Sequence, residues 1–89
     1  MDFALKALNK INNEEVLFKL YELNIDEAIS VRSISKIKNQ KVLLKVVKNA
    51  ESWKVREAAV KNITNKKVLK EVANTDEVEY VRNVAKSRL

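Results

Sequence analysis

The chain has 89 residues and a formal net charge of +6, with 18 Lys and Arg against 12 Asp and Glu. It contains no Cys and no His, which excludes disulfides, thiolate or imidazole metal sites and His-dependent acid–base catalysis. It also lacks Gly and Pro, the residues on which tight strand turns depend, and no apolar run approaches the roughly 18 residues of a membrane span. We expect a cytoplasmic, helical, single-domain protein that is not an enzyme and has no metal or cofactor.

Side chains of one kind recur every 26 residues. Asn13, Asn39 and Asn65 are each followed by two polar residues and then by Val-Leu. Four further columns have the same spacing: Leu20, Val46 and Val72; Ile11, Ile37, Ile63 and Leu89; Phe3, Ile29, Val55 and Val81; and Ala7, Ser33, Ala59 and Ala85. A fixed period of this length indicates a stacked repeat architecture. The predicted units are 1–25, 26–50 and 51–76, followed by a half-unit at 77–89.

Each unit is predicted to hold two short amphipathic helices, A and then B. In chain order we expect seven helices, at about 2–12, 14–23, 27–38, 40–49, 53–64, 66–74 and 77–89. Val55, Ala59 and Ile63 lie four residues apart and form one stripe of an A helix, with a small residue at its centre for close approach of a neighbour. The buried face of the corresponding B helix is predicted to be Val68, Leu69 and Val72.

Asparagine and aspartate are predicted to mark the helix ends. The Asn at 13, 39 and 65 suits the N-cap of each B helix, because its side-chain oxygen accepts hydrogen bonds from free N–H groups. The Asn at 24, 49 and 74 stands where each B helix should end, and Asn tolerates the left-handed conformation found there. Asp76 is predicted to cap the last A helix, with Glu79 completing a capping box.

Helices this short are marginal alone in water, so each must bury its apolar face against the next. The predicted fold is therefore all-α, an α-solenoid of about three and a half two-helix repeats. Leu89 completes the apolar stripe of the last A helix and no B helix follows it. We expect a monomer, with a dimer through the terminal helix as the alternative.

The segments Val55-Arg56-Glu57-Ala58-Ala59 and Val81-Arg82-Asn83-Val84-Ala85, with Asp76 between them, resemble HEAT-like repeats. They are also similar to leucine-rich variant repeats. The resemblance covers residues 26 to 89 well and the first unit weakly. It implies a right-handed solenoid that serves as a binding scaffold, and a structural ladder of Asp76, Arg56 and Arg82 between successive units. Arg32 lies two residues too late for the 26-residue register, so the ladder role is not extended to it.

Positive charge is concentrated in the middle of the chain. Residues 28–52 carry six basic groups against Glu51 alone, whereas residues 1–27 carry three basic and six acidic groups. Lysines at 3- and 4-residue spacing share one helix face, and Lys38, Lys41, Lys45 and Lys48 have this spacing. Lys67 and Lys70 of the next B helix, with Lys66, would extend the patch. An ordinary solvated helix face is the alternative interpretation.

Trp53 begins a predicted A helix at a position where the other units have Glu27 and Glu79. It is a candidate interface anchor, because buried tryptophans often dominate binding energy. The alternative is that it packs over the junction between the helices at 27–38 and 40–49 as local core.

The sequence thus leads to two hypotheses for function. The first is a non-catalytic scaffold that binds a protein partner through its B-helix face, with an acidic partner as one option. The second is sequence-independent binding of a nucleic-acid backbone by the lysine patch. None of the aromatic residues is interleaved with these lysines, so a base-stacking platform is not expected.

Overall fold

The structure is a computed structural model that describes residues 12–89, and these residues form six helices and no strands. In chain order the helices are α2 (Glu14–Leu23), α3 (Glu27–Ser35), α4 (Gln40–Asn49), α5 (Trp53–Val60), α6 (Lys66–Thr75) and α7 (Glu79–Ser87). The all-helical class is confirmed. The helix expected at 2–12 lies outside the described residues. We call α2, α4 and α6 the B helices and α3, α5 and α7 the A helices.

The A helices are shorter than predicted. α3 and α5 end at Ser35 and Val60 rather than at 38 and 64, and α7 begins at Glu79 rather than at 77. After each of the first two, a tight turn forms in which the N–H of Ile37 donates to Ile34 (3.0 Å) and that of Ile63 donates to Val60 (3.2 Å). Both isoleucines are buried. The apolar stripe therefore continues past the helix end, because the turn itself is part of the core.

The predicted N-caps of the B helices are confirmed. In each case the side-chain oxygen of the asparagine accepts from the backbone N–H groups two and three residues later, at 2.9–3.3 Å, for Asn13, Asn39 and Asn65. These bonds satisfy two of the N–H groups that the start of a helix leaves without partners. The three B helices consequently begin at the same place in every unit.

The B helices end in two different ways. Asn24 adopts the predicted left-handed conformation, with φ 50° and ψ 45°. The same prediction is wrong for Asn49 and Asn74, which lie inside α4 and α6; the residues that follow these helices, Ala50 and Asp76, are extended. The prediction that Asp76 caps the last A helix, with Glu79 completing a capping box, is also wrong. The N-cap of α7 is Val78, which has no side-chain cap hydrogen bond, and the N–H of Asp76 donates to the carbonyl of Val72 in α6.

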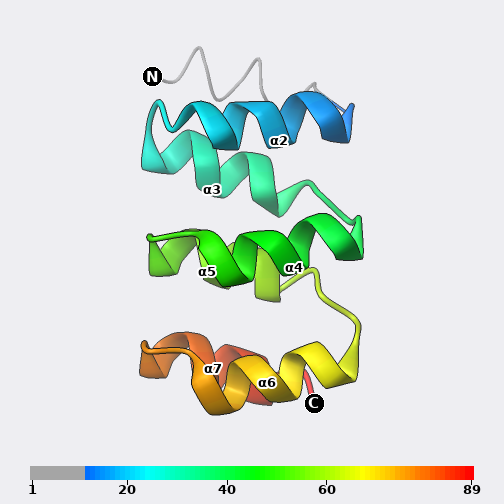
Figure 1. Cartoon of the computed structure of the whole chain (residues 1–89), viewed down its shortest axis with the longest axis vertical. Helices are drawn as coiled ribbons and strands as arrows, with labels where there is room; N and C mark the ends of the chain where they lie inside the picture. Colours follow the sequence, from blue (N-terminus) through cyan, green and yellow to red (C-terminus); the bar gives the residue numbers. More distant parts are fainter. Residues whose placement is uncertain (1–11) are drawn as a thin grey trace.

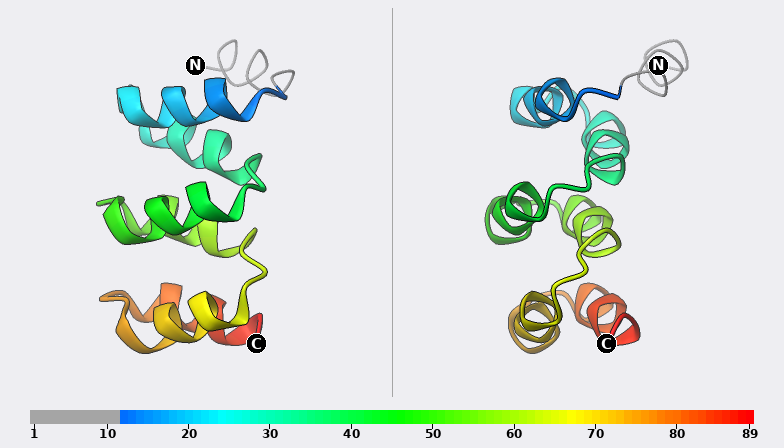
Figure 2. Two further views of the ribbon diagram at one scale, coloured as in Figure 1. Left: turned by 45° about the vertical axis from the view of Figure 1, so that its right-hand side comes forward. Right: turned by 90° about the vertical axis from the view of Figure 1, so that its right-hand side faces the viewer.

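The helices form two layers (Figures 1 and 2). In the right-hand view of Figure 2, α2, α4 and α6 make one column and α3, α5 and α7 the other. Each B helix packs closely against the A helix that follows it, across a three-residue turn. The A helices pack against one another in the order α3, α5, α7. The molecule measures 37 × 21 × 19 Å, and the two-helix units are stacked along its long axis.

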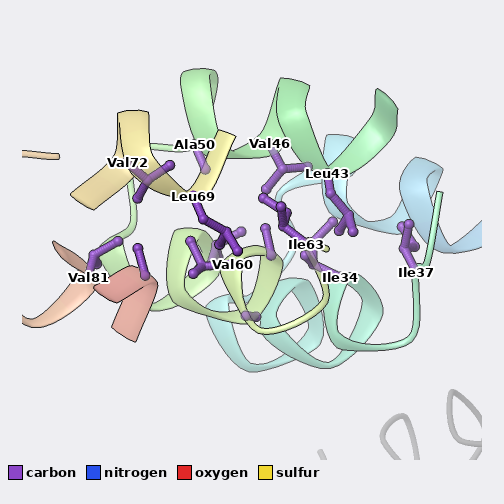
Figure 3. Packing of buried hydrophobic residues seen from close by; sticks show 14 of the residues in the cluster. Ile34, Ile37, Leu43, Val46, Ala50, Val60, Ile63, Leu69, Val72 and Val81 are labelled. Atoms are coloured by element: carbon purple, nitrogen blue, oxygen red, sulfur yellow. The ribbon is translucent and has the colours of Figure 1, made fainter. Parts of the chain in front are cut away.

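Among the described residues, most members of the 26-residue columns lie in the core, including Ile37, Ile63, Val46, Val72 and Val81 in Figure 3. Ile29, Val55 and Val81 are at most 8% exposed, and Ser33, Ala59 and Ala85 are fully buried, whereas Leu89 is 49% exposed. Of each Val-Leu pair, the leucine is the buried member, namely Leu17, Leu43 and Leu69. The valines are peripheral: Val42 and Val68 are half-buried and pack on the core, whereas Val16 is 43% exposed. Val68, predicted on the buried face with Leu69 and Val72, therefore lies at the margin of that face, and the equivalent Val16 lies outside it.

Ala59→Leu should destabilise the protein, because Ala59 is fully buried at the centre of the A-helix layer. The extra methyl and methylene groups would have to displace neighbours, at a cost of about 1–3 kcal/mol. Thermal melts compared with Asn83→Leu, on the exposed side of α7, would isolate the effect, since a surface change stays within about 0.5 kcal/mol. Equal melting temperatures for the two variants would contradict this account of the core.

Candidate docking surface on the B helices

The lysines of α4 and α6 lie on the solvent side of the B layer. Lys41, Lys45 and Lys48 are exposed along α4, opposite the buried Leu43 and Val46. Lys67 and Lys70 are exposed on α6. Within residues 12–89, none of these five makes an ion pair or a side-chain hydrogen bond. Their charges are thus uncompensated and available to a partner. We call Lys41, Lys45 and Lys48 the α4 lysine row.

Lys38 does not belong to this row, although its spacing suggested that it would. α3 ends at Ser35, so Lys38 lies in the turn before α4 rather than on a helix. Its ammonium group donates to the side-chain oxygen of Asn62 at 3.3 Å, and its backbone N–H donates to Glu14 at 2.8 Å. Lys38 therefore holds neighbouring turns together.

Two of the lysines stand where the backbone disfavours them. Lys41 and Lys67 occupy the first turns of α4 and α6, next to the positive end of the helix dipole, where a cation costs about 0.3–1 kcal/mol. α2 has acidic Glu14 and Glu15 in the corresponding turn. The repeat thus accepts the favourable charge in α2 but does not carry it in α4 and α6.

A groove of about 560 Å³ runs between α4 and α6, and one of about 620 Å³ between α2 and α4. Leu44, Val47, Val68 and Val72 supply apolar walls to the first, with Lys48 at its edge. Phe18, Tyr21 and Val46 line the second, whose edge includes Glu22 and Lys45. Burial raises the pKa of Tyr21 above its usual value, and the charge of Glu22 adds to this. The B face therefore offers apolar surface beside unpaired lysines.

Asp76, Arg56 and Arg82 meet at the turns that lead from B helices to A helices. The Arg56 guanidinium forms an ion pair with Asp76 (Nε–Oδ2 2.9 Å) in which the side chains are 13% and 6% exposed. Arg56 also donates to the carbonyl of Ala50, and Arg82 donates to that of Asp76, at 2.8 and 2.6 Å. Ala50 and Asp76 are the C-caps of α4 and α6, so each arginine places positive charge on the negative end of the preceding B helix.

Arg32 is exposed and takes no part in these contacts. Its place in the 26-residue register is occupied by Ser30, which is buried. The turn after α2 is closed instead by the left-handed Asn24, whose N–H donates to the carbonyl of Tyr21. A left-handed asparagine and an arginine are thus alternative ways to end a B helix.

A second set of contacts, at the turns from A to B helices, was not predicted from the sequence. The Gln40 amide accepts from the N–H of Thr64 (2.9 Å) and donates to the carbonyl of Asn62 (3.0 Å). Glu14, 26 residues earlier, accepts from the N–H groups of Lys38 and Asn39. The long polar side chains at 14, 40 and 66 were the available signal. These bonds fix the spacing between successive B helices.

Trp53 lies on the A layer rather than beside the lysines. Its ring packs edge-on against Tyr80 of α7, with centroids 5.4 Å apart, and remains 38% exposed. The expectation that it forms local core over the preceding helix junction is therefore wrong. Lys54 Nζ lies 5.9 Å from the centroid of the same ring. The aromatic pair is separate from the B-helix surface.

The Tyr80 hydroxyl should ionise at higher pH than usual. A hydrogen bond to the Glu57 carboxylate and the negative charge of that group raise its pKa above the ordinary 10.0. Because the folded pKa exceeds the unfolded one, any stability linked to this group is present below pH 10 and lost as the pH rises through the folded pKa. Trp53 fluorescence, quenched by the adjacent tyrosinate, should report the titration. Glu57→Gln should lower its midpoint, and an unchanged midpoint would contradict the contact.

The described residues contain no group of three or more His, Cys, Asp and Glu arranged to hold a metal ion. None of the helices between residues 12 and 89 has the length and apolar character needed to cross a bilayer. Comparisons with protein-family models, with curated proteins and with solved structures gave no match to this chain.

Proposed function

We propose that this protein is a non-catalytic binding scaffold that docks an acidic protein partner on its B-helix face. The observation that carries the proposal is the combination, on one face, of an apolar groove and lysines that have no partner among residues 12–89. Apolar contacts supply binding energy, and complementary charge supplies orientation and speed of association. We place the partner over α4 and α6, where both features occur together.

The scaffold belongs, in this proposal, to the right-handed α-solenoids of HEAT-like type. Three findings support that assignment: the two-layer packing, the burial of side chains at 26-residue spacing, and the contacts of Arg56 and Arg82 with the preceding turns. In such an architecture each unit contacts only its neighbours, and one continuous face is left for ligands. The B layer is that face.

Three of the described carboxylates have structural roles, which fits a non-catalytic function. Asp26 caps α3, Asp76 is held by Arg56, and Glu14 accepts from two backbone N–H groups. Each of these groups is committed to holding a turn in place. General acid–base catalysis would require carboxylates that converge on a substrate.

Binding of a nucleic-acid backbone is the second candidate, favoured by the same unpaired lysines. This candidate predicts a steeper dependence of affinity on salt concentration. If four lysines each neutralised a phosphate, affinity for duplex DNA would fall about 150-fold between 50 and 200 mM salt. A protein partner that also uses the apolar groove would show a weaker salt dependence, because apolar contacts are not screened.

Reversal of the α4 lysine row should abolish partner binding. The variant Lys41→Glu/Lys45→Glu/Lys48→Glu replaces three attractive charges by repulsive ones, and we expect an affinity loss of at least about tenfold, or 1.4 kcal/mol. Affinity capture with wild-type and variant protein, followed by titration of each captured protein, would measure it. The matched control is Lys54→Glu/Lys61→Glu/Lys86→Glu, which changes the net charge equally on exposed A-layer positions.

Equal loss in both triple variants would show that only net charge matters and would contradict a B-face site. Retention on duplex DNA that disappears with the α4 variant and has the steep salt dependence above would favour the nucleic-acid candidate.

A further inference from the structure

The two grooves of the B face differ in the charges along their edges. The lining of the groove between α4 and α6 includes Lys48 and Glu71, the paired Arg56 and Asp76, and Glu51 and Glu77 at the end where the two helices finish. Lys41 and Lys67 are exposed at the other end, in the first turns of α4 and α6. The lining of the groove between α2 and α4 includes Glu22, Glu27 and Glu51 against Lys45. Both linings carry more acidic than basic side chains, but only the groove between α4 and α6 has a lysine in the first turn of each of its two helices.

The walls of this groove suit a helix. α4 and α6 have ten residues each, which corresponds to about 15 Å at 1.5 Å per residue. Leu44 and Val47 project from one side, and Val68 and Val72 from the other, at the three- and four-residue spacing of a helix face. An amphipathic helix of about three turns that lies along the groove would place its apolar stripe against all four, as in other helix-in-groove complexes.

Charge along the groove is polarised from one end to the other. Lys41 and Lys67 stand at the N-terminal ends of α4 and α6, whereas Glu51 and Glu77 stand at the end where these helices finish, together with Lys48 in the last turn of α4. The helix dipoles add to this polarity, since their positive ends lie beside the two lysines. A helical ligand is therefore best accommodated with its own positive N-terminus near Glu51 and Glu77 and its acidic C-terminal half near Lys41 and Lys67.

We infer that the groove between α4 and α6 binds an amphipathic helix of a protein partner that is acidic in its C-terminal half and lies antiparallel to α4 and α6. The inference rests on the proposed function and specifies its ligand. It places Leu44 at the centre of the interface. Leu44 lines the groove without belonging to the buried core, so its contribution is available to the ligand.

The test uses a synthetic 14-residue peptide with Leu at positions 3, 6, 7, 10 and 14, Glu in the last two turns and Lys in the first. A scrambled peptide of the same composition, without the apolar stripe, is the control. Titration of the full chain should give binding at least about tenfold tighter for the patterned peptide, or 1.4 kcal/mol. Equal binding of the two peptides would overturn the inference.

The variant Leu44→Lys distinguishes binding in the groove from binding by charge attraction alone. The third unit carries Lys70 at the corresponding position, 26 residues later, so a lysine is compatible with the fold; circular dichroism would check it. The substitution adds positive charge, and charge attraction alone would strengthen binding of the acidic peptide. We expect it to weaken binding about tenfold or more. Lys45→Glu, at the edge of the other groove, should have a smaller effect. Unchanged or tighter binding by Leu44→Lys would overturn the inference.

Energy transfer from Trp53 tests the antiparallel orientation of the bound peptide separately. Trp53 is the sole tryptophan of the chain and begins α5, directly after the turn that contains Glu51. Energy transfer from Trp53 to a dansyl group should be stronger when the label is on the peptide's N-terminus than on its C-terminus. The reverse order would overturn the antiparallel arrangement.

The failure of this inference can be distinguished from failure of the proposed function. If the α4 triple variant loses peptide binding while Leu44→Lys keeps it, the B face still binds acidic partners, but not through this groove. If neither variant weakens binding, both proposals fall. If duplex DNA displaces the patterned peptide and binds equally to Leu44→Lys, the surface is a backbone-binding site and the helix proposal is overturned.

Discussion

Asp76→Ala should lower the free energy of unfolding by about 3–5 kcal/mol, because it leaves a largely buried cation without its partner. The Arg56–Asp76 pair is bidentate, with Nε–Oδ2 at 2.9 Å and Nη2–Oδ1 at 3.3 Å. Asp76 also accepts from the N–H of Val78 at 2.9 Å, ahead of α7. A domain of this length has a total stability of about 5–10 kcal/mol, so chemical denaturation should show a large fraction of it lost.

Asp26→Ala is the matched control for this prediction. Asp26 is the N-cap of α3 and accepts from the N–H of Ala28 at 2.7 Å, two residues later, as Asp76 accepts from that of Val78, but Asp26 has no arginine partner among the described residues. Its removal should cost only the cap, about 0.5–2 kcal/mol. A loss for Asp76→Ala no greater than that for Asp26→Ala would show that the ion pair contributes nothing.

Leu69→Ala should cost about 2–5 kcal/mol, the range found when a buried leucine is truncated and its site relaxes only in part. Leu69 is 1% exposed and packs in the cluster that contains Val60 and Ile63 (Figure 3). The melting temperature should fall by roughly 4–8 °C for each kcal/mol. Val16→Ala, at a position that is 43% exposed, should change stability by less than about 0.5 kcal/mol. Similar losses in the two variants would contradict the division of each Val-Leu pair into a buried and a peripheral member.

The repeat made the core predictable. Residues at 26-residue spacing meet equivalent surroundings, so apolar columns such as Ile29, Val55 and Val81 could be assigned to the interior from the sequence. The N-caps were predictable for a local reason: an asparagine side chain satisfies N–H groups only two and three residues away. Both signals need no knowledge of how the units pack.

Helix ends that depend on other units were not predictable in this way. Whether a B helix ends at a left-handed asparagine or continues depends on whether Arg56 or Arg82 can reach its last carbonyls. Likewise, the A helices stop before Ile37 and Ile63 because these residues are buried within turns. Tertiary contacts decided these ends, while the local sequence is compatible with a longer helix.

The candidate site was predictable in part. The lysine spacing on α4 follows from helix geometry alone, but Lys38 leaves the row because its turn is tied to Asn62 and Glu14 in neighbouring units. The width of the groove depends on the distance between α4 and α6. That distance is set by contacts between units, such as the one between Gln40 and Thr64. Leu44 is apolar at a position where the next unit has Lys70, which is only a weak sequence signal for a binding residue. The packing of the helices is needed to show that Leu44 lines a groove.

Backbone amide NMR shifts during titration with the patterned acidic peptide test the docking surface most directly. We expect the largest changes along one side of α4 and α6, around Leu44, Val47, Val68 and Val72, with little change in α3 and α7. Changes centred on Trp53 and Tyr80, or spread evenly over every exposed lysine, would contradict a B-face groove as the binding site.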